Sequence, residues 1–143
     1  MTDLDIAKTE LYEEQLTLAI VKNSAVIFQT KIHRITGFLD AVEKLGSDLE
    51  GSSLADRVVG KAIALLCVYA KIREVYAAVL SRKAYAVLKQ NKISVQWKEL
   101  VDNVLDVNKN DMCPFEKAAA DIIDPAKAYK SFKSLRRNLK PCK

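Results

Sequence analysis

Residues 51–70, GSSLADRVVGKAIALLCVYA, constrain the fold of this chain more than any other stretch. The second half, residues 62–70, carries no charged side chain. A helix that is apolar on every side has to be buried among other elements. We therefore predict a helix that begins at Ser52 or Ser53, runs to Ala70 and occupies the centre of the core.

The first half of the same stretch is polar. Asp56, Arg57, Gly60 and Lys61 lie within two turns of the expected helix start. Ser53 and Asp56 have the spacing of a capping box, in which side chains bond the free N–H groups at a helix start. We expect one end of this helix to lie in the core and the other end to face a polar partner.

The length and composition indicate a single globular domain. With 143 residues, of which 50% are hydrophobic and 29% charged, the chain can bury one continuous core without disulfides. We predict one domain over residues 1–143, with residues 127–143 as its basic C-terminal helix and tail. The N-terminal residues lack the regions of a secretory signal, and no apolar run could cross a bilayer. We expect a cytoplasmic protein with no membrane partner.

The excess of positive charge lies at the C-terminus. The formal net charge is +5, and no acidic residue follows Asp124. The basic residues beyond it are Lys127, Lys130, Lys133, Arg136, Arg137, Lys140 and Lys143. A net positive charge favours the binding of anionic partners. The tail is either a solvated helix face or a surface for nucleic acid.

The number and spacing of the three cysteines argue against a disulfide framework. Cys67, Cys113 and Cys142 are an odd number at wide spacings, which fits a reducing compartment. Cys67 lies in the apolar half of the opening stretch, where we expect it to pack as a small core residue.

The N-terminal part of the chain predicts a helix, a β-hairpin and a second helix. Apolar residues recur at helical spacing over residues 3–14. Branched residues over 15–22 and 26–30, separated by a short polar turn, predict the two strands of a hairpin. Residues 37–45 show helical spacing again, with Thr36 as the expected N-cap and Gly46 at the end.

The C-terminal part predicts a parallel crossover followed by two helices. Residues 74–81 are apolar on both faces, as in an interior strand, residues 82–90 form a helix, and residues 93–97 alternate as a second strand. Residues 98–110 fit either a helical turn or an edge strand. Residues 112–121 begin a helix with Pro114 in its first turn, and a basic helix follows over 124–138.

Three segments carry a resemblance to a known family. They are ADRVVGKAIALL (55–66), EVYAAVLSRKAYAVLKQNKI (74–93) and MCPFEKAAADIIDPAKAY (112–129). Together they resemble an uncharacterised prokaryotic family, known as a domain of unknown function, with a cytidine deaminase-like fold, over about residues 5–132. The resemblance implies a three-layer α/β/α domain with a mixed sheet of four to five strands. Related folds often associate as homo-oligomers through helices flanking the site, but the resemblance leaves the oligomeric state open and names no activity.

The zinc ligands of a deaminase are missing from the places where the resemblance would put them. A zinc deaminase uses three His or Cys ligands and a Glu that transfers the proton, at the starts of two successive helices. The matching positions here read SLAD (53–56) and SRKA (81–84), and the single histidine, His33, lies after the hairpin. We therefore expect no metal and no other cofactor.

Helix starts that meet at one edge of a sheet can still bind an anion, because their free N–H groups and dipoles favour negative charge. One predicted wall consists of Ser52, Ser53, Asp56, Arg57 and Lys61, and the other of Ser81, Arg82 and Lys83. We predict that this site binds a nucleotide or a similar anionic small molecule. The alternative is that Ser53 and Asp56 only cap the helix and that Arg57 and Lys61 form a solvated face.

Cys113 is a second candidate for a functional residue, as a reactive thiol. At the N-cap before Pro114, with Glu116 reaching back to its N–H, Cys113 would have a lowered thiol pKa and could act as a nucleophile. The titratable neighbours are Glu116 and Lys117, with no histidine in reach. The catalytic candidates are thus Cys113 and Asp56, and a thiol enzyme is an alternative to simple binding. The structural alternative is a Cys-Pro helix start that docks the last helix.

Overall fold

A mixed sheet of five strands forms the centre of the computed structural model, which describes residues 1–32, 35–102 and 114–138. The strand order is β2-β1-β3-β4-β5. The strands are β1 (Leu18–Lys22), β2 (Ala25–Thr30), β3 (Ser53–Val59), β4 (Glu74–Ser81) and β5 (Ser94–Val101). β1 runs antiparallel to β2 and β3, whereas β3, β4 and β5 are parallel.

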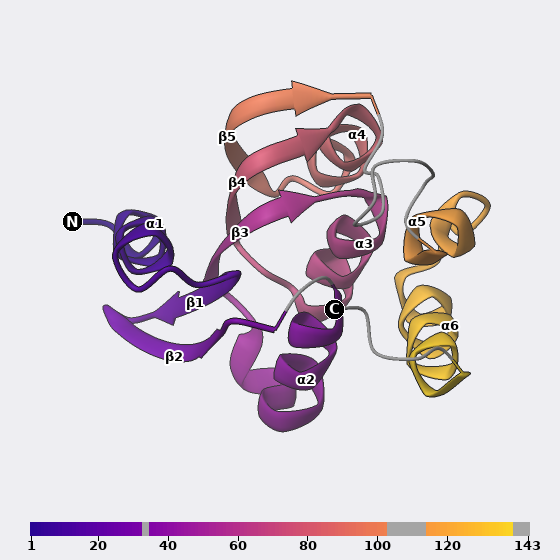
Figure 1. Cartoon of the computed structure of the whole chain (residues 1–143), viewed down its shortest axis with the longest axis horizontal. Coiled ribbons are helices and arrows are strands. Elements are labelled where there is room, and N and C mark those ends of the chain that lie inside the picture. Colours follow the sequence, from indigo (N-terminus) through magenta and orange to yellow (C-terminus); the bar gives the residue numbers. More distant parts are fainter. Residues whose placement is uncertain (33–34, 103–113, 139–143) are drawn as a thin grey trace.

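Helices cover both faces of this sheet. They are α1 (Asp3–Glu13), α2 (Ile35–Leu45), α3 (Lys61–Ala70), α4 (Arg82–Gln90), α5 (Pro114–Ala119) and α6 (Pro125–Asn138), with the short 3-10 helix η1 (Gly46–Leu49) after α2. Figure 1 shows α1 on one face and α2, α3 and α4 on the other, with α5 and α6 outside α3. This arrangement confirms the predicted three-layer α/β class and the mixed sheet.

The buried half of the opening stretch is the centre of the core, as predicted. Leu65, Leu66 and Cys67 on α3 are buried in the cluster that joins the sheet to the outer helices. From the outside, Phe132 of α6 reaches the same cluster and is fully buried. Cys67 therefore packs as a core residue.

The polar half of that stretch was predicted incorrectly, because residues 53–59 form strand β3 and not the first turns of a helix. β3 lies between β1 and β4, so its backbone bonds a neighbour on each side. Helix α3 begins only at Lys61, after Gly60. The expected capping box is also absent, since the Ser53 hydroxyl donates to the Glu74 carboxylate (3.1 Å).

The hairpin is present, and α1 supports its turn. Asn23 and Ser24 adopt positive φ angles of 52° and 66° between β1 and β2. Both of their N–H groups donate to the Asp3 carboxylate at the start of α1, at 3.0 and 2.9 Å. The helix after the hairpin begins at Ile35, so Thr36 lies inside α2 and is not its cap.

The predicted crossover β4-α4-β5 is also present, with β4 and α4 at the predicted bounds. Strand β5 continues to Val101, so residues 98–101 belong to an edge strand. The remainder of the undecided stretch, apart from residue 102, lies outside the described residues. α5 begins at Pro114, and the first two positions of the predicted helix likewise lie outside them.

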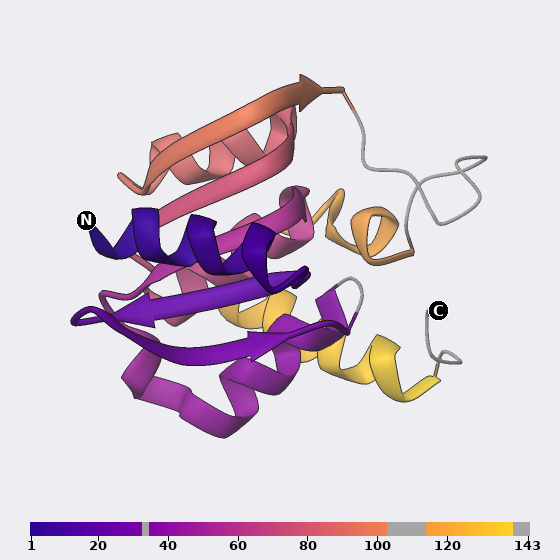
Figure 2. The ribbon, with the colours of Figure 1, turned by 60° about the vertical axis from the view of Figure 1, so that its left-hand side comes forward.

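The basic C-terminal helix docks on the body of the protein (Figure 2). Ala128 and Phe132 of α6 are fully buried. Arg136 donates to Asp40 on α2 at 2.8 Å and also to Glu43. Part of the C-terminal charge is thus paired within the fold. Among the described helices, none has the length and apolar character needed to cross a membrane.

Candidate functional site

The start of α3 is capped by a carboxylate from a different helix. Gly60 at the N-cap has no side chain that could bond the free N–H groups. Instead, the N–H of Lys61 donates to Oε2 of Glu116 (3.0 Å) and the N–H of Ala62 donates to Oε1 (2.8 Å). Glu116 lies on α5 and is buried. An anion therefore occupies the helix start, and it belongs to the chain itself.

Gly60 is what allows the carboxylate to come this close. A Cβ atom added at Gly60 would lie 2.5 Å from the Glu116 Cδ and 2.8 Å from its Oε2. Carbon atoms in proteins do not approach so closely without a shift, so any other residue at this position would displace the carboxylate. The glycine is required by space, because its φ of −101° suits any residue.

Opposing effects act on the Glu116 carboxyl at this helix start, and burial is the largest of them. Burial raises the pKa of Glu116 above its ordinary value, whereas the N–H bonds from Ala62 and Lys61 and the charges of Lys83 and Lys61 act in the opposite direction. The Lys61 ammonium also donates to the carbonyl of Ala120, at 2.9 Å. Lys61, Lys83 and Glu116 are thus the predicted site residues that the fold brings together.

The Glu116 carboxylate bonds the start of α3. The predicted bond from the N–H of Cys113 to Glu116 stays a prediction, because it involves a residue that the structure does not describe. Cys113 itself, like His33, lies outside the described residues. Lys117 follows on α5 and is exposed. The thiol-enzyme hypothesis therefore stays a prediction, as does nucleic-acid binding by residues 127–143.

The second predicted wall lies at the start of α4. The Ser81 hydroxyl accepts from the N–H of Ala84 (3.1 Å) and so caps the helix. Arg82 pairs with Asp102 at 2.9 Å, where both side chains are exposed. Lys83 is exposed and acts on Glu116 through its charge. Because β3 and β4 are parallel neighbours, α3 and α4 begin at the same edge of the sheet.

The other residues of the first predicted wall lie elsewhere. Side chains alternate between the faces of a strand, so Arg57 points to the α1 side of the sheet. Its guanidinium donates to the carbonyls of Leu16 (2.8 Å) and Leu11 (3.0 Å) and lies over the ring of Tyr12. The Ser52 hydroxyl donates to the carbonyl of Leu49 (2.6 Å), and Ser53 lies at the end of β3 that is farthest from the start of α3.

Asp56 is a buried carboxyl on the central strand, only 8% exposed. Burial raises its pKa to about 7, although the N–H groups of Val58 and Arg57 and the charge of Arg57 oppose the shift. The N–H of Val58 donates to the carboxyl at 3.2 Å. Burial also raises the thiol pKa of Cys67, with a further contribution from the Asp56 charge. Asp56 is therefore a titratable group inside the core.

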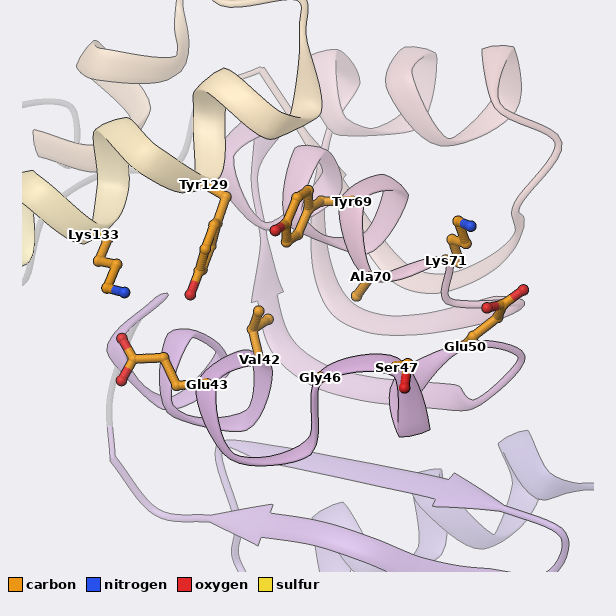
Figure 3. Close-up of a pocket in the computed structure, with 10 residues that line it drawn as sticks. All are labelled: Val42, Glu43, Gly46, Ser47, Glu50, Tyr69, Ala70, Lys71, Tyr129 and Lys133. Atoms are coloured by element: carbon orange, nitrogen blue, oxygen red, sulfur yellow. The ribbon is translucent and has the colours of Figure 1, made fainter.

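The structure also contains a pocket that the sequence did not predict. It has a volume of about 640 Å³ and lies at the other end of α3, between α2 and α6 (Figure 3). Tyr69 of α3 and Tyr129 of α6 form part of its lining. Tyr69 and Tyr129 are far apart in the sequence, and a single aromatic residue on a helix gives no sign that it lines a pocket. Within the described ranges, no three His, Cys, Asp or Glu side chains are arranged to hold a metal ion.

Solved structures resemble the chain to different degrees. A crystal structure of a DUF1893 family protein from Thermotoga maritima is 26% identical, with a TM-score of 0.83 over 94% of this chain and 90% of that one. The dCMP deaminase from cyanophage S-TIM5 is 16% identical, with a TM-score of 0.48 over 66% of this chain and 91% of that one.

A third similar structure is the diaminohydroxyphosphoribosylaminopyrimidine deaminase/5-amino-6-(5-phosphoribosylamino)uracil reductase from Thermotoga maritima. It is 18% identical, with a TM-score of 0.46 over 80% of this chain and 39% of that one. With TM-scores below 0.5, the two deaminases support no statement about activity. No curated protein matches the chain. The family model described as Domain of unknown function (DUF1893) matches residues 6–135, and the chain therefore belongs to this family, as its sequence motifs indicated.

Proposed function

We propose that this protein binds an anionic small molecule, such as a nucleotide, at the start of α3. The site, here called the α3 edge, consists of the N–H groups of Lys61 and Ala62 and the side chains of Lys61 and Lys83. The observation that carries the proposal is the buried Glu116 carboxylate, which accepts both N–H groups. A position that holds one anion out of water has the donors and charge to hold another.

The ligand would take the place of Glu116. A phosphate group has more oxygens and more negative charge than a carboxylate, so it gains more from the two N–H donors and from the lysines. For this exchange, the Glu116 side chain would have to move away from the start of α3. In this mechanism the backbone and lysines supply the binding, and Glu116 is the internal competitor.

The test follows the backbone amides of Lys61 and Ala62 by NMR during titration with inorganic phosphate and with AMP. We expect both amide signals to move. Glu116→Gln removes the competing charge and should tighten binding about tenfold, whereas Lys83→Gln should weaken it several-fold. Lys92→Gln is the matched control, because Lys92 is an exposed lysine after the other end of α4.

The proposal fails if the two amide signals stay in place at millimolar phosphate and AMP. It also fails if Glu116→Gln binds no better than the unmodified protein. Glutamine keeps one acceptor oxygen for the start of α3, and circular dichroism would establish that the variant is folded.

A further inference from the structure

The pocket at the far end of α3 has the dimensions of a small-molecule site. Its volume of about 640 Å³ lies in the range usual for such sites. Figure 3 shows Tyr69 and Tyr129 on one side and Val42 and Gly46 on the other. Charged side chains lie toward the two ends, so the middle of the pocket is mostly apolar and aromatic.

Two tyrosines from different helices stack on each other at the pocket. The rings of Tyr69 and Tyr129 stack with centroids 4.7 Å apart and planes within 14°. Tyr69 remains 38% exposed although it packs against another ring. Exposed aromatic faces favour contact with a second flat ring, which gains both burial and stacking. The face of Tyr69 turned away from Tyr129 can therefore extend the stack to a planar ligand, which suits this position better than an aliphatic one.

The unpaired charges of the lining are mainly positive. Lys71 and Lys133 border the pocket, and neither pairs with an acidic side chain in the described part of the chain. Lys133 instead lies over the ring of Tyr129, with its Nζ 5.8 Å from the ring centroid. Of the two acidic lining residues, Glu43 is bonded by Arg136, and Glu50 lies exposed near Lys71.

We propose that this pocket, which we call the tyrosine pocket, binds a small molecule with a planar conjugated ring and an anionic group. The ring stacks on the face of Tyr69 turned away from Tyr129, and the carboxylate or phosphate pairs with Lys71 or Lys133. This site is separate from the α3 edge, because it is lined by the end of α3 and not by its start. It binds its ligand whether or not the α3 edge binds phosphate.

The experiment uses isothermal titration of the full chain with two probes, 1-naphthoate for a carboxylate and 4-nitrophenyl phosphate for a phosphate. Acetate tests the anion without a ring, and 1-naphthalenemethanol tests a ring without charge. An excess of inorganic phosphate occupies the α3 edge while 4-nitrophenyl phosphate is titrated. We expect at least one of the two probes to bind and acetate and 1-naphthalenemethanol each to bind about tenfold more weakly. Tyr69→Leu should weaken the probe about tenfold.

Lys71 has a well-matched control in Lys92. Both lysines follow a helix, α3 or α4, and both adopt a left-handed backbone, with φ angles of 59° and 60°. Glycine suits that backbone, so Lys71→Gly and Lys92→Gly should each leave the fold intact. We expect Lys71→Gly to weaken the probe several-fold, more so with Lys133→Gln added, and Lys92→Gly to leave its affinity unchanged.

Two results would overturn the proposal. One is that neither probe binds the folded protein. The other is that a probe binds equally well to Tyr69→Leu and to Lys71→Gly combined with Lys133→Gln. Glu116→Gln and Lys83→Gln serve to separate the two sites, because they should change phosphate binding at the α3 edge and leave the naphthoate affinity as it is.

Discussion

Replacing Asp56 by asparagine should stabilise the protein at neutral and alkaline pH. The carboxyl is buried on β3, and burial raises its pKa from 3.8 to about 7. Asparagine is close to the same shape and keeps an oxygen that can accept the N–H of Val58. The variant therefore removes a buried charge without removing that hydrogen bond.

The direction in which stability changes with pH follows from proton linkage. An acid with a raised pKa in the folded state keeps its proton while the unfolded chain releases it, so the unfolding free energy falls as pH rises from 3.8 through about 7. The full difference between the two pKa values corresponds to about 4 kcal/mol. Between about pH 5 and about pH 8, the loss amounts to about 2.5 kcal/mol. Asparagine does not titrate, so the Asp56→Asn variant lacks this contribution to the pH dependence of stability.

The assay is urea unfolding of both proteins at a series of pH values from about 5 to about 8. We expect the stability difference between Asp56→Asn and the unmodified protein to grow in favour of the variant by about 2 to 3 kcal/mol over this range. Asp48→Asn is the control, because Asp48 is exposed. A difference that stays constant with pH would show that Asp56 titrates as an ordinary carboxyl and would refute the argument.

Three further predictions concern packing and reactivity. Gly60→Ala should lower the unfolding free energy by about 1 to 3 kcal/mol, because the Cβ of the alanine would press on the Glu116 carboxylate. An unchanged melting temperature in thermal denaturation would contradict this prediction. Phe132→Ala should cost about 3 to 5 kcal/mol, since this ring is fully buried, and a loss below 1 kcal/mol would mean that α6 does not dock as described. Cys67 should react with iodoacetamide far more slowly than Cys113 in the folded protein, because Cys67 is buried and its thiol pKa is raised. The two rates are measured by mass spectrometry of the labelled peptides, and equal rates would contradict the prediction.

Elements whose pattern is local could be predicted from the sequence. The bounds of β4 and α4 agree with the prediction because a run of apolar residues is followed by Ser81, which caps α4. The apolar half of α3 is buried as expected. In each case the information needed lies within about ten neighbouring residues.

Strand β3 could not be recognised in this way. Asp56 and Arg57 interrupt its apolar pattern, and what makes them acceptable in a central strand lies far away in the sequence. Arg57 is satisfied by carbonyls around the end of α1, and Asp56 faces the core beside Cys67. Polar residues next to a glycine resemble a helix start when these distant partners are unknown.

The candidate site shows the same limit. The sequence indicated that Glu116 stabilises the start of its own helix, but it gave no sign that the same carboxylate caps α3. Similarly, no local pattern links Tyr69 to Tyr129 across the tyrosine pocket. Contacts between residues more than fifty positions apart had to come from the three-dimensional structure.

The remote cap of α3 has a consequence for the order in which the chain folds. The sheet and α3 are complete by residue 101, but the carboxylate that caps α3 follows only at position 116. During synthesis from the N-terminus, the central helix therefore emerges with free N–H groups at its start and gains its cap late. Because loop closure precedes this contact, the first turn of α3 becomes ordered later than the rest of that helix. A nascent chain ending near residue 102 should have protected amides throughout β3 and β4 but rapid hydrogen exchange at Lys61 and Ala62.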